Sequence, residues 1–178
     1  MYAGVSNLVL EVIMFVKYLK LFVFIPVFSI FTGCLLVDAK SVKEMEPVGP
    51  PINAALHAEY IALAESEESK GSHFTSSFFA SKARLAGRGD PVAPETLESW
   101  DIAPGERNKL QIGRAKLIIA IADAGRVISS KNAARAQVMY DCWVVESESK
   151  RKTSSVESCK ANFVKALDDL HSGLKASR

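Results

Sequence analysis

The sequence predicts an all-α protein, a compact bundle of about five helices after an N-terminal signal or anchor segment. Apolar residues recur at helical spacing in five segments of the chain, whereas no alternating strand pattern of any length occurs. Five helical segments with short connections favour helices that pack on one another around one core.

The first two predicted helices form a hairpin. Residues 53–70 make the first helix, with Asn53 as a candidate N-cap, and Gly71 follows its end. Residues 73–86 make the second helix. The apolar positions expected to share a face are Leu56, Tyr60 and Leu63 in the first helix and Phe74, Phe78 and Leu85 in the second.

The longest break in the helical pattern covers residues 87–104. Pro91, Pro94 and Pro104 exclude a regular helix interior there. Trp100 lies within this loop, and we expect it to pack back on the core, because a large aromatic ring is costly to leave in water.

Three further helices are predicted at 105–124, at 131–148 and from Ser154, which together with Glu157 has the spacing of a capping box. We expect the third helix to be the most buried and residues 172–178 to form a polar tail. The apolar stripes comprise Leu110, Leu117, Ile118, Ile119 and Ile121 in the third helix, Ala133, Ala136, Tyr140 and Trp143 in the fourth, and Val156, Cys159, Phe163, Ala166 and Leu170 in the fifth.

The N-terminal segment predicts export. A basic stretch, the apolar run 21–31 and small residues lead to Cys34, and this pattern resembles a bacterial lipoprotein signal. In that interpretation residues 1–33 are removed, translation starts at Met14, and Cys34 carries a covalent lipid, with no other cofactor expected. Residues 34–52 then form a lipidated tether, because three prolines and mixed charges occur there without periodicity.

Two alternatives to lipidation remain open. The segment could be cleaved without lipid attachment, or residues 21–37 could stay as a membrane anchor interrupted by Pro26. All three interpretations export residues 38–178. Acidic and basic residues are nearly balanced after the signal, which argues against a nucleic-acid partner.

Cys142 and Cys159 form an even pair in an exported chain, which indicates one disulfide. The two cysteines are equidistant from the turn between the last two helices, so an antiparallel hairpin brings them together. Such a bridge contributes about 3 kcal/mol in the chain-entropy description. The alternative is two buried free thiols. A metal site is not expected, because two thiolates without further ligands do not complete one.

A series of short motifs resembles the N-terminal helical region of alphaproteobacterial lipoproteins in the outer-membrane protein A (OmpA) family. The most specific motif runs from Ala133 to Trp143 and includes Asp-Cys-Trp. The others are Glu59–Ala64, Phe79–Ala83, Val92–Glu95, Trp100 and Cys159–Phe163.

This resemblance implies an exported, membrane-tethered helical domain of the cell envelope, with Cys142 and Cys159 as its disulfide. Relatives continue into a C-terminal domain that grips peptidoglycan, and no such domain follows before Arg178. Peptidoglycan binding is therefore not carried over. The segment Gly71–His73 and the residues after Trp143 also depart from the family pattern.

Candidate chemistry is sparse, and no catalytic residue is predicted. His57, His73 and His171 have no partners at metal-ligand spacing, so we expect surface or capping positions. Asp141 is expected near the edge of the buried face, paired with Arg135 or Arg114. A ligand-binding or catalytic role for Asp141 is the alternative to that ion pair.

The leading functional hypothesis is a non-enzymatic lipoprotein of the bacterial outer membrane, facing the periplasm, with a structural role or a protein partner in the envelope. The residue after Cys34 is Leu35 rather than Asp, which favours delivery to the outer membrane. The alternative is a periplasmic module that binds a small ligand or a cell-wall fragment on Trp100 and Trp143. An envelope enzyme dependent on Asp141 is the third hypothesis.

Overall fold

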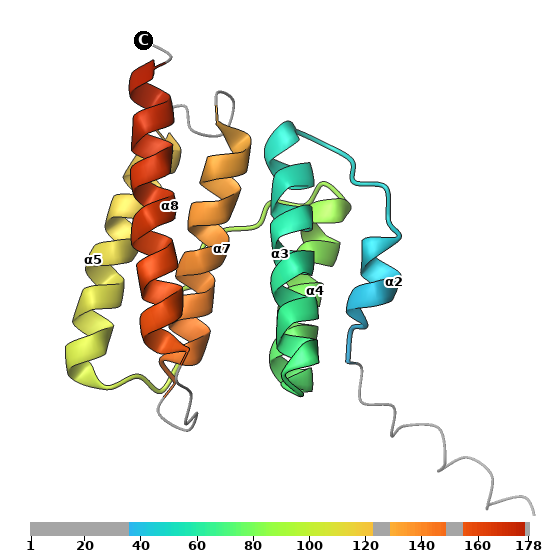
Figure 1. The fold of residues 1–178 in the computed structure, drawn as a ribbon, viewed down its shortest axis with the longest axis horizontal. Coiled ribbons are helices and arrows are strands. Elements are labelled where there is room, and N and C mark those ends of the chain that lie inside the picture. The colour runs from blue at the N-terminus through green and yellow to red at the C-terminus, as the bar shows by residue number, and fades with distance from the viewer. Residues whose placement is uncertain (1–35, 123–128, 149–154, 177–178) are drawn as a thin grey trace, which may run out of the picture. The chain divides into compact units, whose positions relative to one another are not determined.

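The computed structural model describes residues 36–122, 129–148 and 155–176. The predicted signal, Cys34 and Ser154 of the predicted capping box lie outside these residues. The helices are α2 (Ala39–Lys43), α3 (Pro51–Ser69), α4 (His73–Gly87), α5 (Pro104–Ala120), α7 (Ser130–Glu146) and α8 (Val156–Ala176) (Figure 1). The described ranges contain no strand, only an isolated bridge between Ile102 and Glu148, so the all-α prediction is confirmed.

The segment before α3 differs from the predicted tether. Asp38 caps α2, because its carboxylate accepts the backbone N–H groups of Lys40 and Ser41 at 3.3 and 3.0 Å. Ala39 and Val42 are buried against α3 and α4. The five-residue helix is too short to show apolar periodicity, and it is stabilised by this packing rather than by propensity.

The α3–α4 hairpin turns at Gly71, whose φ of 77° is in the left-handed region that glycine adopts at little cost. Two details differ from the prediction. α3 starts at Pro51, which suits the first turn, so Asn53 is inside the helix rather than at its cap. Asn53 instead donates to the backbone oxygens of Ala86 and Asp90 at 3.3 and 2.9 Å.

Of the predicted apolar stripe of α4, Phe78 packs against the core, but Phe74 and Leu85 lie on the outer side of the helix. Phe74 is 73% exposed and Leu85 is also exposed. The inner side is formed by smaller residues around Phe79, because α3 and α4 pack closely through alanines. The buried positions of α4 are Thr75, Ser76, Ser77, Phe79, Ala80, Lys82, Ala83, Ala86 and Gly87.

The most buried helix is α7 and not α5, contrary to the prediction. α7 lies between α3 and α8, and every residue from Ala136 to Glu146 is buried (Figure 1). α5 packs on α7 and α8 along one side, so it buries a single stripe of Leu110, Gly113, Leu117 and Ala120. Ile118 and Ile119, expected in the core, are exposed.

The α7–α8 hairpin contains the disulfide between Cys142 and Cys159, whose Cα atoms are 5.6 Å apart. Both residues are buried in the core. α8 continues to Ala176 and buries Leu174. Residues 172–176, expected to belong to a polar tail, are therefore part of this helix.

Candidate functional site

Five polar side chains meet inside the bundle and form what we call the buried polar cluster: Tyr60 from α3, Lys82 from α4, Glu95 from the loop before α5, and Gln137 and Asp141 from α7. The Lys82 ammonium contacts Asp141 Oδ2 at 2.5 Å and Glu95 Oε1 at 2.6 Å. Tyr60 donates its hydroxyl to Asp141 Oδ2 at 2.5 Å, and Gln137 donates to the Tyr60 oxygen at 3.3 Å. The Glu95 backbone N–H completes the cluster by donating to Asp141 Oδ1 at 2.8 Å.

The cluster also holds the proline loop (residues 88–103), which connects α4 to α5 without regular structure. Gln137 donates to the Val92 carbonyl at 2.9 Å, and Lys82 contacts the Ala93 carbonyl at 3.4 Å. Because backbone polar groups in a packed segment need partners, these side chains replace the hydrogen bonds that a helix would supply.

Two arginines of α5 hold the rest of the proline loop. Arg114 donates to the Glu95 and Pro94 carbonyls at 2.8 and 3.3 Å. Arg107 donates to the carbonyls of Leu97 and Trp100 at 2.8 and 2.6 Å. Side chains from α3, α4, α5 and α7 therefore fix one loop, and the loop in turn joins the helices.

Burial and charge set the ionisation of the cluster. Burial raises the pKa of Asp141 above its usual value, against the opposing effects of the Lys82 charge and the donors on its oxygens. Burial alone lowers the Lys82 pKa, but the charges of Asp141 and Glu95 outweigh it and hold that pKa above its ordinary value. Burial and the neighbouring Asp141 raise the Tyr60 pKa well above 10.

Asp141 is deeper and differently paired than the sequence suggested. It has no exposed surface, and its partners are Lys82, Tyr60 and the Glu95 backbone rather than an arginine. Arg135 pairs instead with Glu59 at 2.8 Å. The predicted pairing with Arg135 or Arg114 is therefore wrong, and the partner is Lys82, which lies 59 positions earlier in the chain.

The two tryptophans occupy separate environments. Trp100 packs against the core, as predicted, with its ring edge-on to Phe78 at 5.6 Å and its N–H donated to Glu95 at 3.2 Å. Trp143 is 4% exposed, its ring is tilted against that of Phe163 with the centroids 5.8 Å apart, and it donates its N–H to Glu106 at 2.8 Å. Neither indole offers a free polar edge to a ligand.

The histidines divide between core and surface. His57, expected at the surface, is buried, and its Nδ1 lies 3.0 Å from the Ala83 carbonyl. His73 contacts Glu68 at 2.8 Å near the α3–α4 turn, and both side chains are exposed. Among the described residues, no three His, Cys, Asp or Glu side chains gather in a metal-binding arrangement.

An apolar patch lies on the outer side of α5, comprising Ile112, Ile118 and Ile119, with exposed fractions of 52%, 41% and 62%. An open groove of about 450 Å³ adjoins it. The groove is lined by Leu97 and Glu98 of the proline loop and by Arg107, Gln111, Arg114, Ala115, Ile118 and Ile119 of α5.

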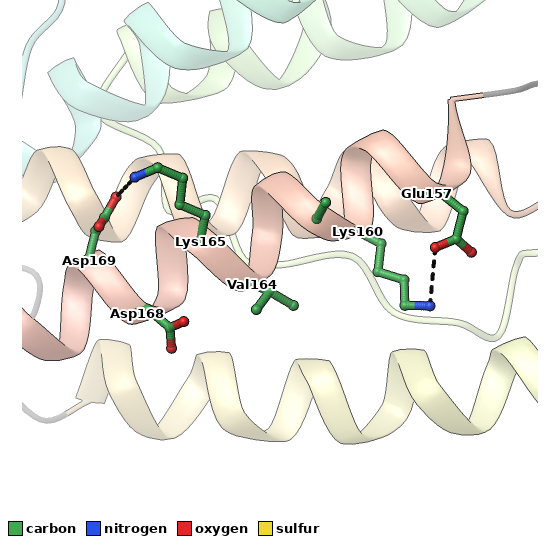
Figure 2. Close-up of a pocket in the computed structure, with 7 residues that line it drawn as sticks. Glu157, Lys160, Val164, Lys165, Asp168 and Asp169 are labelled. Carbon is green, nitrogen blue, oxygen red and sulfur yellow. Dashed lines mark hydrogen bonds and ion pairs between the residues drawn. The ribbon is translucent and has the colours of Figure 1, made fainter.

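A second open hollow follows α8. Figure 2 shows two surface ion pairs, Glu157–Lys160 and Lys165–Asp169, with Val164 between them and Asp168 beside the second pair. The pairs measure 3.5 and 2.8 Å, and three of the four side chains are more than half exposed, so the pairs contribute little to stability. A single helix face lines this hollow, and a small molecule would be enclosed from one side only.

Sequence reasoning singled out Asp141 but none of the other four members of the buried polar cluster for a polar role. The motifs that carry the family resemblance nevertheless contain all five residues of the cluster. Glu59–Ala64 contains Tyr60, Phe79–Ala83 contains Lys82, Val92–Glu95 ends at Glu95, and Ala133–Trp143 contains both Gln137 and Asp141. These separate motifs converge at one point, which is the physical connection between them.

The fold and this site define a disulfide-linked helical bundle built around a buried ion-pair cluster. Comparison with known protein families, with curated proteins and with solved structures found no match. None of the helices in the described ranges is both long and apolar enough to cross a membrane.

Proposed function

We propose that the chain is a non-enzymatic lipoprotein of the bacterial cell envelope, anchored at the outer membrane by a lipid on Cys34 and facing the periplasm. Its helical domain acts as a structural or protein-interaction module similar to that of OmpA-family lipoproteins. The observation that carries the proposal is the buried Cys142–Cys159 disulfide between α7 and α8. Disulfides persist in oxidising compartments such as the bacterial periplasm, where the signal pattern would deliver the chain.

The buried polar cluster supports a structural role over a catalytic one. A catalytic acid or base must come within hydrogen-bond reach of its substrate. Asp141 is fully enclosed, and both of its oxygens accept hydrogen bonds from within the protein. Its raised pKa has a structural explanation in burial, and structural ion pairs also perturb pKa values.

The α5 patch supports a protein-interaction role. Contiguous exposed apolar residues are typical of surfaces that bind a protein partner. Ile118 and Ile119 line one groove with Leu97 and Ala115, and the Arg107 and Arg114 side chains in the same groove are fixed by the proline loop. A rigid apolar patch with a polar border suits an envelope protein as partner.

The small-ligand alternative has less support. Its proposed platform required Trp100 and Trp143 together, but Trp143 is buried between Phe163 and the Lys160 side chain. The hollows on α5 and α8 are open surfaces, whereas small-molecule sites enclose most of their ligand.

The deciding experiment is the intact mass of the detergent-extracted protein, with and without an inhibitor of the lipoprotein signal peptidase. We expect a product that begins with acylated Cys34 and a precursor that accumulates under the inhibitor. Thiol alkylation before and after reduction then reports whether Cys142 and Cys159 are joined.

A matched control is Cys34→Ala, which removes the acyl acceptor and leaves the helical domain unchanged. This variant should yield no acylated product, and its disulfide should still form if export is intact. An unmodified chain that retains residues 21–31 would contradict lipidation, and free thiols at Cys142 and Cys159 in the native cell would contradict export itself.

A further inference from the structure

The chain contacts the helical bundle only a few residues after the predicted lipid site at Cys34. The backbone N–H of Val37 donates to Ser77 Oγ of α4 at 2.7 Å, and Asp38 then caps α2. Cys34 is three residues before Val37, and three extended residues span at most about 11 Å. By chain length alone, a lipid on Cys34 is attached within about that distance of Val37, whose backbone is bound to α4.

The same end of the bundle exposes apolar side chains. Phe74 is one helical turn before Ser77, and its exposed fraction of 73% is the highest among the large apolar side chains of the described residues. Leu36, next to Val37, is 47% exposed. Figure 1 shows that α2 begins at the end of the bundle where α3 turns into α4.

The polar groups described around Phe74 include no lysine or arginine that lines the hollow beside it. Glu68 and His73 contact each other at 2.8 Å, and the hollow beside Phe74 is lined by Gly71, Ser72 and Thr75 together with Glu148. Clusters of basic residues that attract anionic lipid are absent from this set of neighbours. An aromatic ring among small polar residues suits the boundary between headgroups and acyl chains.

We propose that Leu36 and Phe74 form a membrane-contact surface, with the Phe74 ring inserted into the lipid bilayer to which Cys34 anchors the protein. This inference rests on the proposed anchor at Cys34. It adds an orientation, in which the α3–α4 turn faces the bilayer and the α5 patch remains free along the side of the bundle.

The test places a tryptophan at Phe74 in the full acylated chain and measures its quenching by brominated lipid in zwitterionic vesicles. Leu85→Trp is the matched control, because Leu85 is an exposed apolar residue on the same helix three turns away. The signal of Trp100 and Trp143 is subtracted with the unsubstituted protein. We expect strong quenching in Phe74→Trp, little in Leu85→Trp, and no dependence on salt.

A second variant avoids reliance on the reporter. Phe74→Ser should weaken vesicle binding of the unacylated domain about tenfold or more, since it removes the burial of one large apolar side chain. Leu85→Ser should leave binding unchanged.

Flotation of the acylated protein with vesicles distinguishes a failure of the proposed orientation from a failure of the proposed anchor. A chain that floats without selective quenching at position 74 overturns the orientation alone. A chain that neither carries lipid nor floats overturns the anchor and the orientation with it.

Discussion

The two sides of α7 are held by different chemistry. On the side toward α3 and α4, Gln137 and Asp141 join the buried polar cluster through hydrogen bonds and an ion pair. On the side toward α8, Cys142 forms a disulfide and Trp143 packs on Phe163. Charge pairing depends on geometry and ionisation, whereas a covalent link depends on redox state, so the two sides should fail under different conditions.

The largest effect is expected when the charged side of α7 is broken at Lys82. Lys82→Met leaves the Asp141 and Glu95 carboxylates facing each other without their shared cation. Removing one partner of a buried ion pair costs about 3–5 kcal/mol of unfolding free energy. Urea denaturation followed by circular dichroism measures this loss.

A surface pair provides the control for the Lys82 variant. Lys165→Met breaks the solvated pair with Asp169, whose side chains are 75% and 53% exposed. We expect a change of at most about 0.5 kcal/mol there. Equal losses of unfolding free energy for the two substitutions would mean that the buried ion pair stabilises the fold no more than a solvated one.

The second-largest loss of stability is expected when the disulfide between α7 and α8 is removed. Replacing Cys142 and Cys159 together by alanine removes a cross-link over a separation of 17 residues, for which about 3 kcal/mol is expected. Reduction of the unsubstituted protein should lower the free energy of unfolding by a similar amount. If the double variant is as stable as the oxidised protein, the disulfide is dispensable and packing alone holds α8.

Packing on the apolar side can be tested at Gly113 of α5. A Cβ there would lie 3.1 Å from the Trp143 ring and 3.2 Å from the Phe163 ring, closer than ordinary contact. Because both rings are buried, we expect Gly113→Ala to cost about 1–3 kcal/mol.

Gly105, in the first turn of the same helix, is the control. Nothing lies within 4 Å of a Cβ at this position, so alanine should stabilise the protein by up to about 1 kcal/mol through lower chain entropy. Opposite signs for the two substitutions would confirm that close ring packing, rather than helix propensity, keeps glycine at 113.

The charged side should weaken at alkaline pH. In the unfolded chain, tyrosine and lysine lose their protons near pH 10 and 10.4. The folded pKa values of Tyr60 and Lys82 are raised, so the native state retains protons that the unfolded state has released. Stability is therefore intact below about pH 10 and falls above it, by about 1.4 kcal/mol per pH unit for each group.

Denaturation midpoints from pH 8 to 11 measure this dependence. Tyr60→Phe removes one titrating group and should flatten the alkaline slope, while lowering stability at pH 8. Asp141 has a raised folded pKa, so by the same sign rule its ionisation opposes folding, and its protonation does not cause acid unfolding. An unchanged alkaline slope in Tyr60→Phe would contradict the assigned direction of the Tyr60 shift.

Features of the fold and of the buried polar cluster could be predicted from the sequence only where the spacing of residues along the chain determines which residues meet. The positions of Cys142 and Cys159 about one turn predicted their pairing, because a hairpin fixes which residues face each other. The partners of Asp141 could not be predicted in this way, since Tyr60 and Lys82 come from a different hairpin. Which stripe of a helix is buried also depends on its neighbours, and for that reason the predictions for Phe74 and Ile119 were wrong.

The smallest effect on the free energy of unfolding is expected for Tyr140→Phe, in contrast to the same substitution at Tyr60. Tyr60 donates its hydroxyl to Asp141, whereas no described residue accepts a hydrogen bond from the buried Tyr140 hydroxyl, whose ring packs edge-on to Phe163 at 5.6 Å. Tyr60→Phe should cost about 1.5–3 kcal/mol, because a hydrogen bond to a charged group is lost. Tyr140→Phe removes a polar atom without a partner and should be neutral or slightly stabilising, within about 0.5 kcal/mol. A large loss in Tyr140→Phe would show that its hydroxyl is bonded after all, and the side of α7 toward α8 would then be partly polar like the other.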